Sequence, residues 1–224
     1  MYLVLSSAQA KKAAGVFSGC VFPAGLAMVI VAGSELFTGN NLMIMGVLAR
    51  TITARQMLRN WLVVYLGNFA GALLVAALCV SGHVFSAFGG KLAASVVTIA
   101  QTKAGLSFGD AFVRGILCNF LVCIAVWMAN AAKTVGGKIA AVFFPIMAFV
   151  VAGFEHSVAN MYYLAAGLFT AGQTGAAAEG LTWGRALIGN LLPVTLGNLV
   201  GGGLLVGVSA WYLYLKKEIN SVNS

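Results

Sequence analysis

Long apolar stretches alternate with short polar connections along this chain. Runs of about 20 mainly apolar residues can each cross the hydrocarbon core of a bilayer as a helix. The pattern predicts an all-α integral membrane protein with five such spans. They fall near residues 13–35, 57–81, 111–132, 138–154 and 187–215.

The composition supports a membrane environment. Of the 224 residues, 61% are hydrophobic and only 8% are charged, which leaves a soluble domain of this size too little polar surface. The net charge is +8, but the basic residues stand at the ends of the apolar runs and not together on one aromatic-rich face. We therefore expect a lipid bilayer as the partner of this surface, and no nucleic acid.

The basic residues also predict an orientation. The side of a membrane protein that carries more Lys and Arg is usually cytoplasmic. This rule places the C-terminus in the cytoplasm, beneath the cell membrane. The predicted cytoplasmic side carries Arg50, Arg55, Arg59, Lys133, Lys138, Lys216 and Lys217, and the opposite side carries Lys11, Lys12, Lys91 and Arg185.

Two parts of the chain repeat each other. "NWLVVYLGNFAG" at 60–71 matches "NLLPVTLGNLVG" at 190–201, and "GSELFTGN" at 33–40 matches "GFEHSVAN" at 153–160. Each half thus contains a span, an interruption with a glutamate, a short apolar run and a span with Gly-Asn. Unwound backbone at membrane depth is tolerated only where it lines a cavity or is buried in protein, so matching interruptions indicate a permeation site.

The two halves differ in length. A span containing Asn119 precedes the interruption of the second half, and its counterpart would lie before Met1. Three spans per half would make the repeats inverted, so we expect six spans in the complete fold and five here. Within a single channel domain we assign residues 1–82 to the incomplete first half-repeat, 83–107 to a connecting segment and 108–215 to the second half-repeat.

Ionisable residues at the interruptions are the candidate chemistry, because a charge at membrane depth is costly unless it has a function. Glu35 and Glu155 can alternatively tie down the broken backbone by accepting hydrogen bonds from its amides. Asn68 and Asn198 are candidate caps for these loops or partners that fix the tautomer of His156. Ordinary hydrogen bonding between helices is the alternative for both asparagines.

His156 is the candidate proton donor, because the imidazole exchanges protons near physiological pH. In a narrow apolar passage it would protonate a weak-acid anion, so that a neutral species crosses without the cost of desolvating an ion. Apolar side chains near both interruptions are candidates for the constrictions, with packing against lipid or helices as the alternative. They are Phe22, Leu26, Leu36, Phe37 and Phe149.

Lys103 is the candidate vestibule cation. It precedes the span that begins near Phe108, on the predicted outer side. There it would concentrate small anions and assist proton donation by His156, or else reach to interfacial water as lysines near helix ends commonly do.

A cofactor or metal is not expected. The chain has two histidines, and its four cysteines lack a C-x-x-C spacing, which argues against haem and metal centres.

Five strings, in order, resemble the formate/nitrite transporter family: "GSELFTGN", "NWLVVYLGNFAGALL", "GILCNFLVCIAVWMA", "GFEHSVANM" and "LLPVTLGNLVGGGLLVG". The resemblance implies an aquaporin-like protomer of two inverted repeats with broken second and fifth spans. It also implies a homopentamer with one pore per protomer, which passes small monovalent anions such as formate, nitrite or hydrosulfide together with protons.

The same resemblance assigns roles to individual residues. His156 matches the pore histidine, Thr38 the threonine that faces it, and Lys103 the vestibule lysine. Glu155 and Asn198 match the hydrogen-bonding partners of the histidine. The constrictions fall at Leu26, Leu36 and Phe149, with Phe22 and Phe37 as further candidates, and Glu35, Asn68 and Asn119 are expected to brace the loops.

Several alternatives remain at this stage. The proline in "NLLPVTLGN" favours formate, with nitrite and hydrosulfide open. An aquaporin needs two Asn-Pro-Ala caps, which the sequence lacks, and an ammonium channel prefers two pore histidines. A membrane-embedded enzyme would have only Glu155 and His156 to work with, so we expect a channel and not an enzyme. A purely structural partner protein would leave His156 and Lys103 dispensable.

Overall fold

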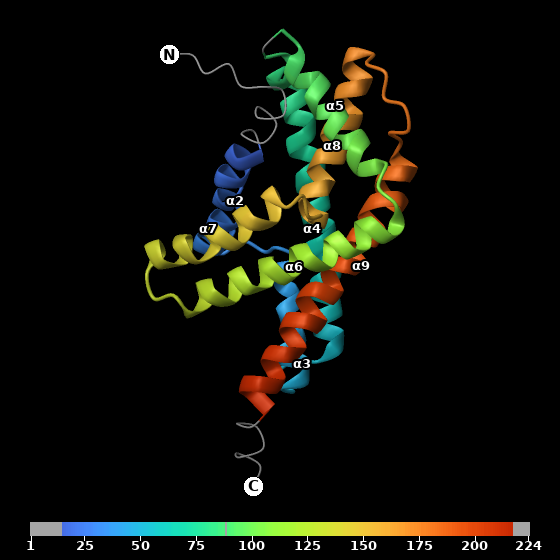
Figure 1. The fold of residues 1–224 in the computed structure, drawn as a ribbon. Coiled ribbons are helices and arrows are strands. Elements are labelled where there is room, and N and C mark those ends of the chain that lie inside the picture. The colour runs from blue at the N-terminus through green and yellow to red at the C-terminus, as the bar shows by residue number, and fades with distance from the viewer. Residues whose placement is uncertain (1–14, 88, 217–224) are drawn as a thin grey trace.

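The computed structural model describes residues 15–87 and 89–216. In this part of the chain the backbone forms helices joined by turns, without a strand. The all-α prediction is confirmed (Figure 1).

The first half contains a helix that is broken after Gly33. This glycine has φ 72°, a left-handed conformation that ends helices and that glycine adopts without steric cost. The predicted interruption is therefore present. The elements of this half are a helical stretch Gly15–Ala32 that includes α2 (Pro23–Ala32), then η1 (Gly39–Met43), α3 (Ile44–Leu48) and α4 (Ala54–Ser81).

The second half is broken in the same way at Gly153, which has φ 69°. Helices α7 (Val135–Val151) and α8 (Ser157–Thr174) flank this break, and α6 (Phe108–Ala131) precedes them. One continuous helix, Arg185–Leu215, ends the described chain. It comprises η3 (Arg185–Leu191), α9 (Leu192–Asn198), η4 (Leu199–Val208) and η5 (Trp211–Leu215).

The connection between the halves is itself helical. Residues 83–107, expected only to connect the halves, contain η2 (Val84–Ser86) and α5 (Lys91–Ala104). Helix α5 packs along α8, and this packing brings Lys103, near its C-terminus, to the second break.

Local sequence explains where the long helices begin. Thr53 and Gln56 form a reciprocal capping box at the start of α4, and the Ser107 hydroxyl accepts the backbone N–H of Asp110 at the start of α6. Thr134 caps α7 in the same way. Each cap satisfies backbone donors that the first turn of a helix leaves unpaired.

The protein is a multi-pass membrane protein. Four described helices are long and apolar enough to cross a bilayer: Gly15–Ala32, Ala54–Ser81, Phe108–Ala131 and Arg185–Leu215. On α4 the side chains of Leu58, Leu62 and Leu66 are exposed, as expected of a surface that faces lipid or another subunit. The number of spans in the complete fold stays a prediction.

Glycines allow α6 to approach the last helix closely. Helices α6 and α7 lie side by side and cross the direction of α4 and the last helix (Figure 1). A methyl group on Gly197 would collide with the carbonyl of Phe112, and one on Gly201 with the carbonyl of Ile116. Backbone therefore meets backbone at this crossing, as small residues commonly permit in membrane helices.

A buried apolar cluster fixes the helices around the second break. Leu26 of α2, Val122 of α6, and Ile146 and Phe149 of α7 pack together. This cluster holds the end of α7, and with it the backbone that leads to His156.

Candidate permeation site

Matching hydrogen bonds hold the two breaks. The Asn198 amide donates to the carbonyl of Glu155 at 3.1 Å and accepts the N–H of Ser157 at 2.9 Å. Its counterpart Asn68 donates to the carbonyl of Glu35 at 3.1 Å and accepts the N–H of Phe37 at 3.0 Å. Both asparagines therefore satisfy backbone groups that the broken helix leaves unpaired.

A second matching pair of contacts involves asparagines that sequence reasoning missed. Asn160 donates to the Glu155 carboxylate at 2.6 Å and to Asn190 Oδ1 at 2.8 Å. In the first half Asn40 donates to the Glu35 carboxylate, and also to Asn60 Oδ1 at 2.8 Å. The repeat itself carried a usable signal, because both pairs of asparagines coincide in the aligned strings.

One contact between the halves joins a residue to its own counterpart in the repeat. Tyr65 and Thr195 are counterparts in the repeat at the offset of 130 residues, and their hydroxyls lie 3.0 Å apart. A position and its own counterpart therefore meet between α4 and α9.

Asn119 connects both breaks from α6. Its amide donates to the carbonyl of Thr38 at 3.2 Å, to Asn41 Oδ1 at 2.8 Å and to the carbonyl of Asn198 at 2.7 Å. The Cys123 thiol donates to the Thr38 carbonyl as well, at 3.4 Å. Thr38 is thus fixed by buried groups of α6.

The structure brings Thr38 and His156 together. Thr38 Oγ1 lies 2.8 Å from His156 Nε2, and the His156 Nδ1 accepts the backbone N–H of Ala159 at 3.1 Å. Because Nδ1 is an acceptor, the proton of the neutral ring lies on Nε2, and the Thr38 hydroxyl accepts it. The same ring is the N-cap of α8.

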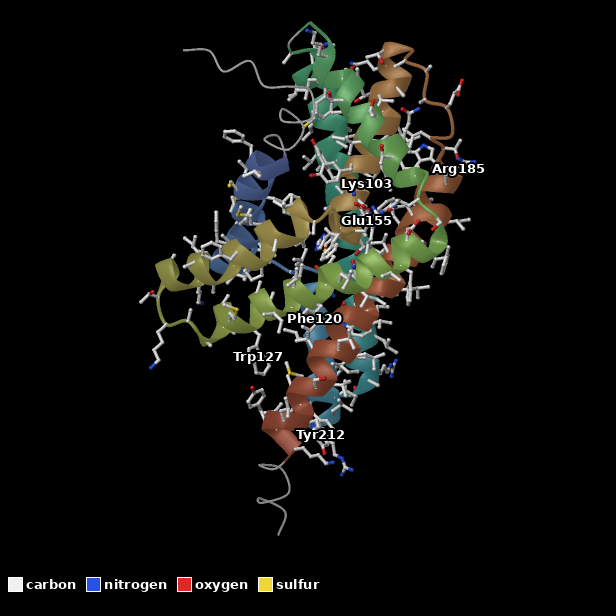
Figure 2. The ribbon with its side chains drawn as sticks, viewed as in Figure 1. Lys103, Phe120, Trp127, Glu155, Arg185 and Tyr212 are labelled. Atoms are coloured by element: carbon white, nitrogen blue, oxygen red, sulfur yellow. The ribbon has the colours of Figure 1, made fainter. Side chains whose placement is uncertain are left out.

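Lys103 forms an ion pair with Glu155 (Figure 2). Its Nζ lies 2.9 and 3.0 Å from the two carboxylate oxygens, and 5.5 Å from the centroid of the Tyr163 ring. The exposed fractions of the two charged side chains are 15% and 6%. A cation and a neutral amide, that of Asn160, therefore offset the cost of burying this carboxylate.

Two expectations from the sequence need correction. Glu155 and Asn198 form no hydrogen bond with the imidazole of His156, whose hydrogen-bond partners among the described residues are Thr38 and the Ala159 amide. Phe37, a further constriction candidate, lines none of the three cavities described below. Phe37 is 3% exposed, and its ring packs edge to face against Trp61 and Tyr65. It thus fastens the first break to α4.

Three adjoining cavities follow one another through the protein, and His156 lines the first two. The Lys103 cavity, about 280 Å³, is lined by Lys103, Glu155, His156, Asn160 and Tyr163 among others. It shares Phe22, Phe149, His156 and Ala159 with the central cavity of about 430 Å³. The central cavity in turn shares Leu26, Val29 and Leu36 with the Lys138 cavity of about 600 Å³, which is lined by Ser34, Asn130, Lys138 and others.

The shared residues mark the two boundaries along this path. At one boundary the Phe22 and Phe149 rings are 5.5 Å apart, and Phe149 stacks on His156 at 5.9 Å. At the other boundary stand Leu26 and Leu36. The structure thus places four of the five constriction candidates where adjoining cavities meet, with the histidine at the first boundary.

These features together indicate a pathway through a membrane. They are the two broken helices, the buried contact between Thr38 and His156, and the row of adjoining cavities. The sequence model of the family described as formate/nitrite transporter matches residues 1–212. The chain belongs to the formate/nitrite transporter family. The resemblance seen in the five strings is confirmed.

Relatives of known name agree with this membership. A probable formate transporter of Methanothermobacter thermautotrophicus is 41% identical over 215 residues, covering 89% of this chain and 75% of the relative. The formate channel FocA of Haemophilus influenzae is 42% identical over 207 residues, covering 87% and 72%. The family is described as one of transporters.

Solved structures of the formate/nitrite transporter family share the fold. One, described as a pentameric formate channel with formate bound, has a TM-score of 0.79 at 34% identity and covers 92% of this chain and 85% of its own. Another, described as an FNT family ion channel, has a TM-score of 0.80 at 35% identity, covering 93% and 79%.

Proposed function

We propose that this protein is a formate channel of a cell membrane, in which His156 protonates the anion as it enters the central cavity. The observation that carries the proposal is the position of the imidazole. It lines both the Lys103 cavity and the central cavity, whose walls are largely apolar. An anion that passes this boundary must lose its water, and protonation removes most of that cost.

The proton balance follows from the tautomer. An imidazolium gives one proton to formate, which leaves formic acid and a neutral ring. A neutral ring with its proton on Nε2 matches the contact in which Nδ1 accepts the Ala159 amide. Loss of the proton from Nδ1 is therefore coupled to completion of the cap of α8, and a proton taken up from the bulk solution through the Lys103 cavity restores the imidazolium.

Lys103 assists by holding charge at the entrance. Its ammonium group lines the cavity that precedes His156 and is shared between Glu155 and the Tyr163 ring. An entering anion shares this cation with Glu155. The ion pair therefore attracts the anion but does not bind it so tightly that release becomes slow, and conduction requires both.

The relatives support formate as the substrate and a pentamer as the assembly. Two similar proteins are named for formate, and a solved relative is a pentamer. We propose the same assembly here, with the Lys138 side and the C-terminus in the cytoplasm. Nitrite and hydrosulfide are the alternative substrates, because one protonation mechanism serves all three weak acids.

The experiment is anion flux into proteoliposomes between pH 5 and pH 8. Formate, nitrite and hydrosulfide are compared for the parent, His156→Asn and Lys103→Ala. We expect formate flux that rises toward low pH in the parent. We also expect a loss of on the order of 100-fold at low pH in His156→Asn, in the range of general acid catalysis.

A matched control is His83→Asn, because His83 is the other histidine and is exposed at η2. It should behave as the parent does. Flux in His156→Asn equal to the parent would overturn the role of His156, and flux without anion selectivity would overturn the function. A hydrolytic or redox activity that depends on His156 in detergent, without flux, would support the enzyme alternative.

A further inference from the structure

A closed ring of hydrogen bonds begins and ends at Lys103. Its Nζ donates to both carboxylate oxygens of Glu155, at 2.9 and 3.0 Å, and the Asn160 amide donates to the same carboxylate at 2.6 Å. Asn160 also donates to Asn190 Oδ1 at 2.8 Å, and the Asn190 amide donates to the backbone carbonyl of Lys103 at 2.9 Å. The side chain and the backbone of one lysine are thus connected through three other residues.

The ring fastens the end of α5 to the second break. Lys103 lies in the last turn of α5, Glu155 in the break, Asn160 in α8 and Asn190 in η3. The two asparagines are 1% and 0% exposed, so a lost bond leaves a buried polar group unpaired, which is costly. Four segments that are distant in the sequence are therefore held together by polar contacts in the interior.

Asn190 fixes the direction of the bonds around this ring. A carbonyl can only accept, so the NH2 group of Asn190 must face Lys103 and its Oδ1 must face Asn160. Asn160 must then act as a donor toward Asn190, and its other N–H reaches Glu155. A donor stabilises the negative charge of a carboxylate. Asn190 forms no described hydrogen bond with either charged group, yet it orients the amide that does.

The two members of the ion pair are held differently. The backbone carbonyl of Glu155 accepts the Asn198 amide, which fixes the carboxylate to the break. The carbonyl of Lys103 accepts the Asn190 amide and the N–H of Leu106, but the second of these bonds is local and moves with the end of α5. Loss of the Asn190 amide should therefore displace the cation and leave the carboxylate in place.

The first half lacks this connection. Asn60 is the counterpart of Asn190, and its Oδ1 accepts the Asn40 amide, which also donates to the Glu35 carboxylate. Among the described residues, the side-chain amide of Asn60 donates to no carbonyl and Glu35 forms no ion pair. A pair of asparagines is common to both breaks, and within the described chain only the second pair extends to a lysine.

We infer that Asn190 is a positioning residue that keeps the ammonium group of Lys103 at the wall of the Lys103 cavity. This inference rests on the proposed function, in which Lys103 attracts the entering anion. Asn190 does not line that cavity, so it acts on the anion only through Lys103.

Asn190→Ala tests this role in the flux assay. We expect the formate concentration for half-maximal flux to rise by about twofold to fivefold, the range between a unit charge moved from about 4 Å to about 8 Å in water and one lost altogether. A purely structural role would lower the amount of folded channel, and with it the maximal flux, but would leave the half-saturating concentration unchanged. Asn190→Leu keeps a similar volume and provides the same measurement where the alanine variant yields little folded protein.

Two further variants show whether the effect passes through Lys103. In the Lys103→Ala background, Asn190→Ala should leave the half-saturating concentration where Lys103→Ala puts it, because residues that act through one group do not have additive effects. Asn60→Ala is the matched control, since it removes the corresponding bond to Asn40. It should not change the half-saturating concentration.

A chemical measurement follows Lys103 without transport. Cyanate carbamylates the amines of lysines, and mass spectrometry of the digested protein gives the rate at each one. Lys103 should react faster in Asn190→Ala than in the parent, because a displaced side chain is more accessible. Lys91, which is exposed at the start of α5, is the internal reference.

The outcomes separate this inference from the proposed function. An unchanged half-saturating concentration in Asn190→Ala, an equal rise in Asn60→Ala, or additive effects with Lys103→Ala would overturn the positioning role. Equal cyanate rates at Lys103 in the parent and in Asn190→Ala would do the same. A parent protein that carries no formate would overturn the proposed function, and the cyanate rates would still decide whether Asn190 positions Lys103.

Discussion

The two helix breaks share one scaffold but not one chemistry. In both, an asparagine from a later helix holds the broken backbone, and a second asparagine binds the glutamate. The position that carries His156 in the second half carries Leu36 in the first. Glu155 is buried and paired with Lys103, whereas Glu35 is exposed. The hydrogen bonds thus maintain the geometry of both breaks, and His156 and Lys103 give the second break its different chemistry.

The largest expected difference between the halves is steric. Gly201 faces the carbonyl of Ile116, whereas its counterpart Gly71 has open space where a methyl group would stand. Gly201→Ala should cost ~3 kcal/mol or more, and Gly71→Ala should be neutral or stabilise α4 by ~0.5 kcal/mol. Folded protein retained on heating in detergent measures both. A similar loss in both variants would show that the first half is equally crowded.

The capping asparagines should differ by less. Asn198→Ala removes three buried hydrogen bonds, which the amide makes to the Glu155 carbonyl, the Ser157 N–H and the Gly115 carbonyl. We expect a loss of ~3 kcal/mol, at ~1 kcal/mol for each lost hydrogen bond. Asn68→Ala removes two bonds at a half-buried site, so the loss should be ~1–2 kcal/mol. The same thermal assay decides, and equal losses would remove the distinction.

The two glutamates should differ in transport. Glu155→Gln frees Lys103 to bind the anion alone, so the formate concentration for half-maximal flux should fall about fivefold, and the maximal rate should fall with it because release is slower. Glu35→Gln is the matched control and should change neither. A half-saturating concentration that stays constant in Glu155→Gln would show that the anion does not share Lys103 with the carboxylate.

The smallest effect is expected where the halves meet. Tyr65→Phe removes one hydrogen bond to Thr195 and keeps the packing of the ring against Phe37. The cost should be ~0.5–1 kcal/mol. Thr195→Val should cost about the same, and the double variant should cost little more than either one, as expected for partners in one bond. Additive losses would argue that the two hydroxyls act separately.

The sequence predicted the breaks well because their cause is local. Gly33 and Gly153 each follow an apolar run, and both adopt the left-handed conformation that ends a helix. The repeat added information, since each interruption supported the other. The all-α membrane fold could be predicted for the same reason, because long apolar runs are a local feature of the sequence.

Pairings between distant residues were harder to predict. Lys103 and Glu155 are 52 residues apart, and Asn190 reaches the carbonyl of Lys103 across 87 residues. Such contacts depend on the packing of α5 along α8, and the mild apolar character of 91–104 did not distinguish a helix from a connection. The packing of Phe37 against Trp61 and Tyr65 could not be predicted either, because an apolar side chain beside a break can face the conduit or the helix behind it and the sequence pattern is the same for both.

The Tyr65–Thr195 contact also bears on ancestry. In a dimer of two identical half-length chains arranged like these halves, that position would meet its own copy, so both side chains would be the same residue. A large ring opposite a small hydroxyl is possible only when each half is encoded separately. At this contact, joining the halves in one chain allows a complementarity that a symmetric dimer cannot have.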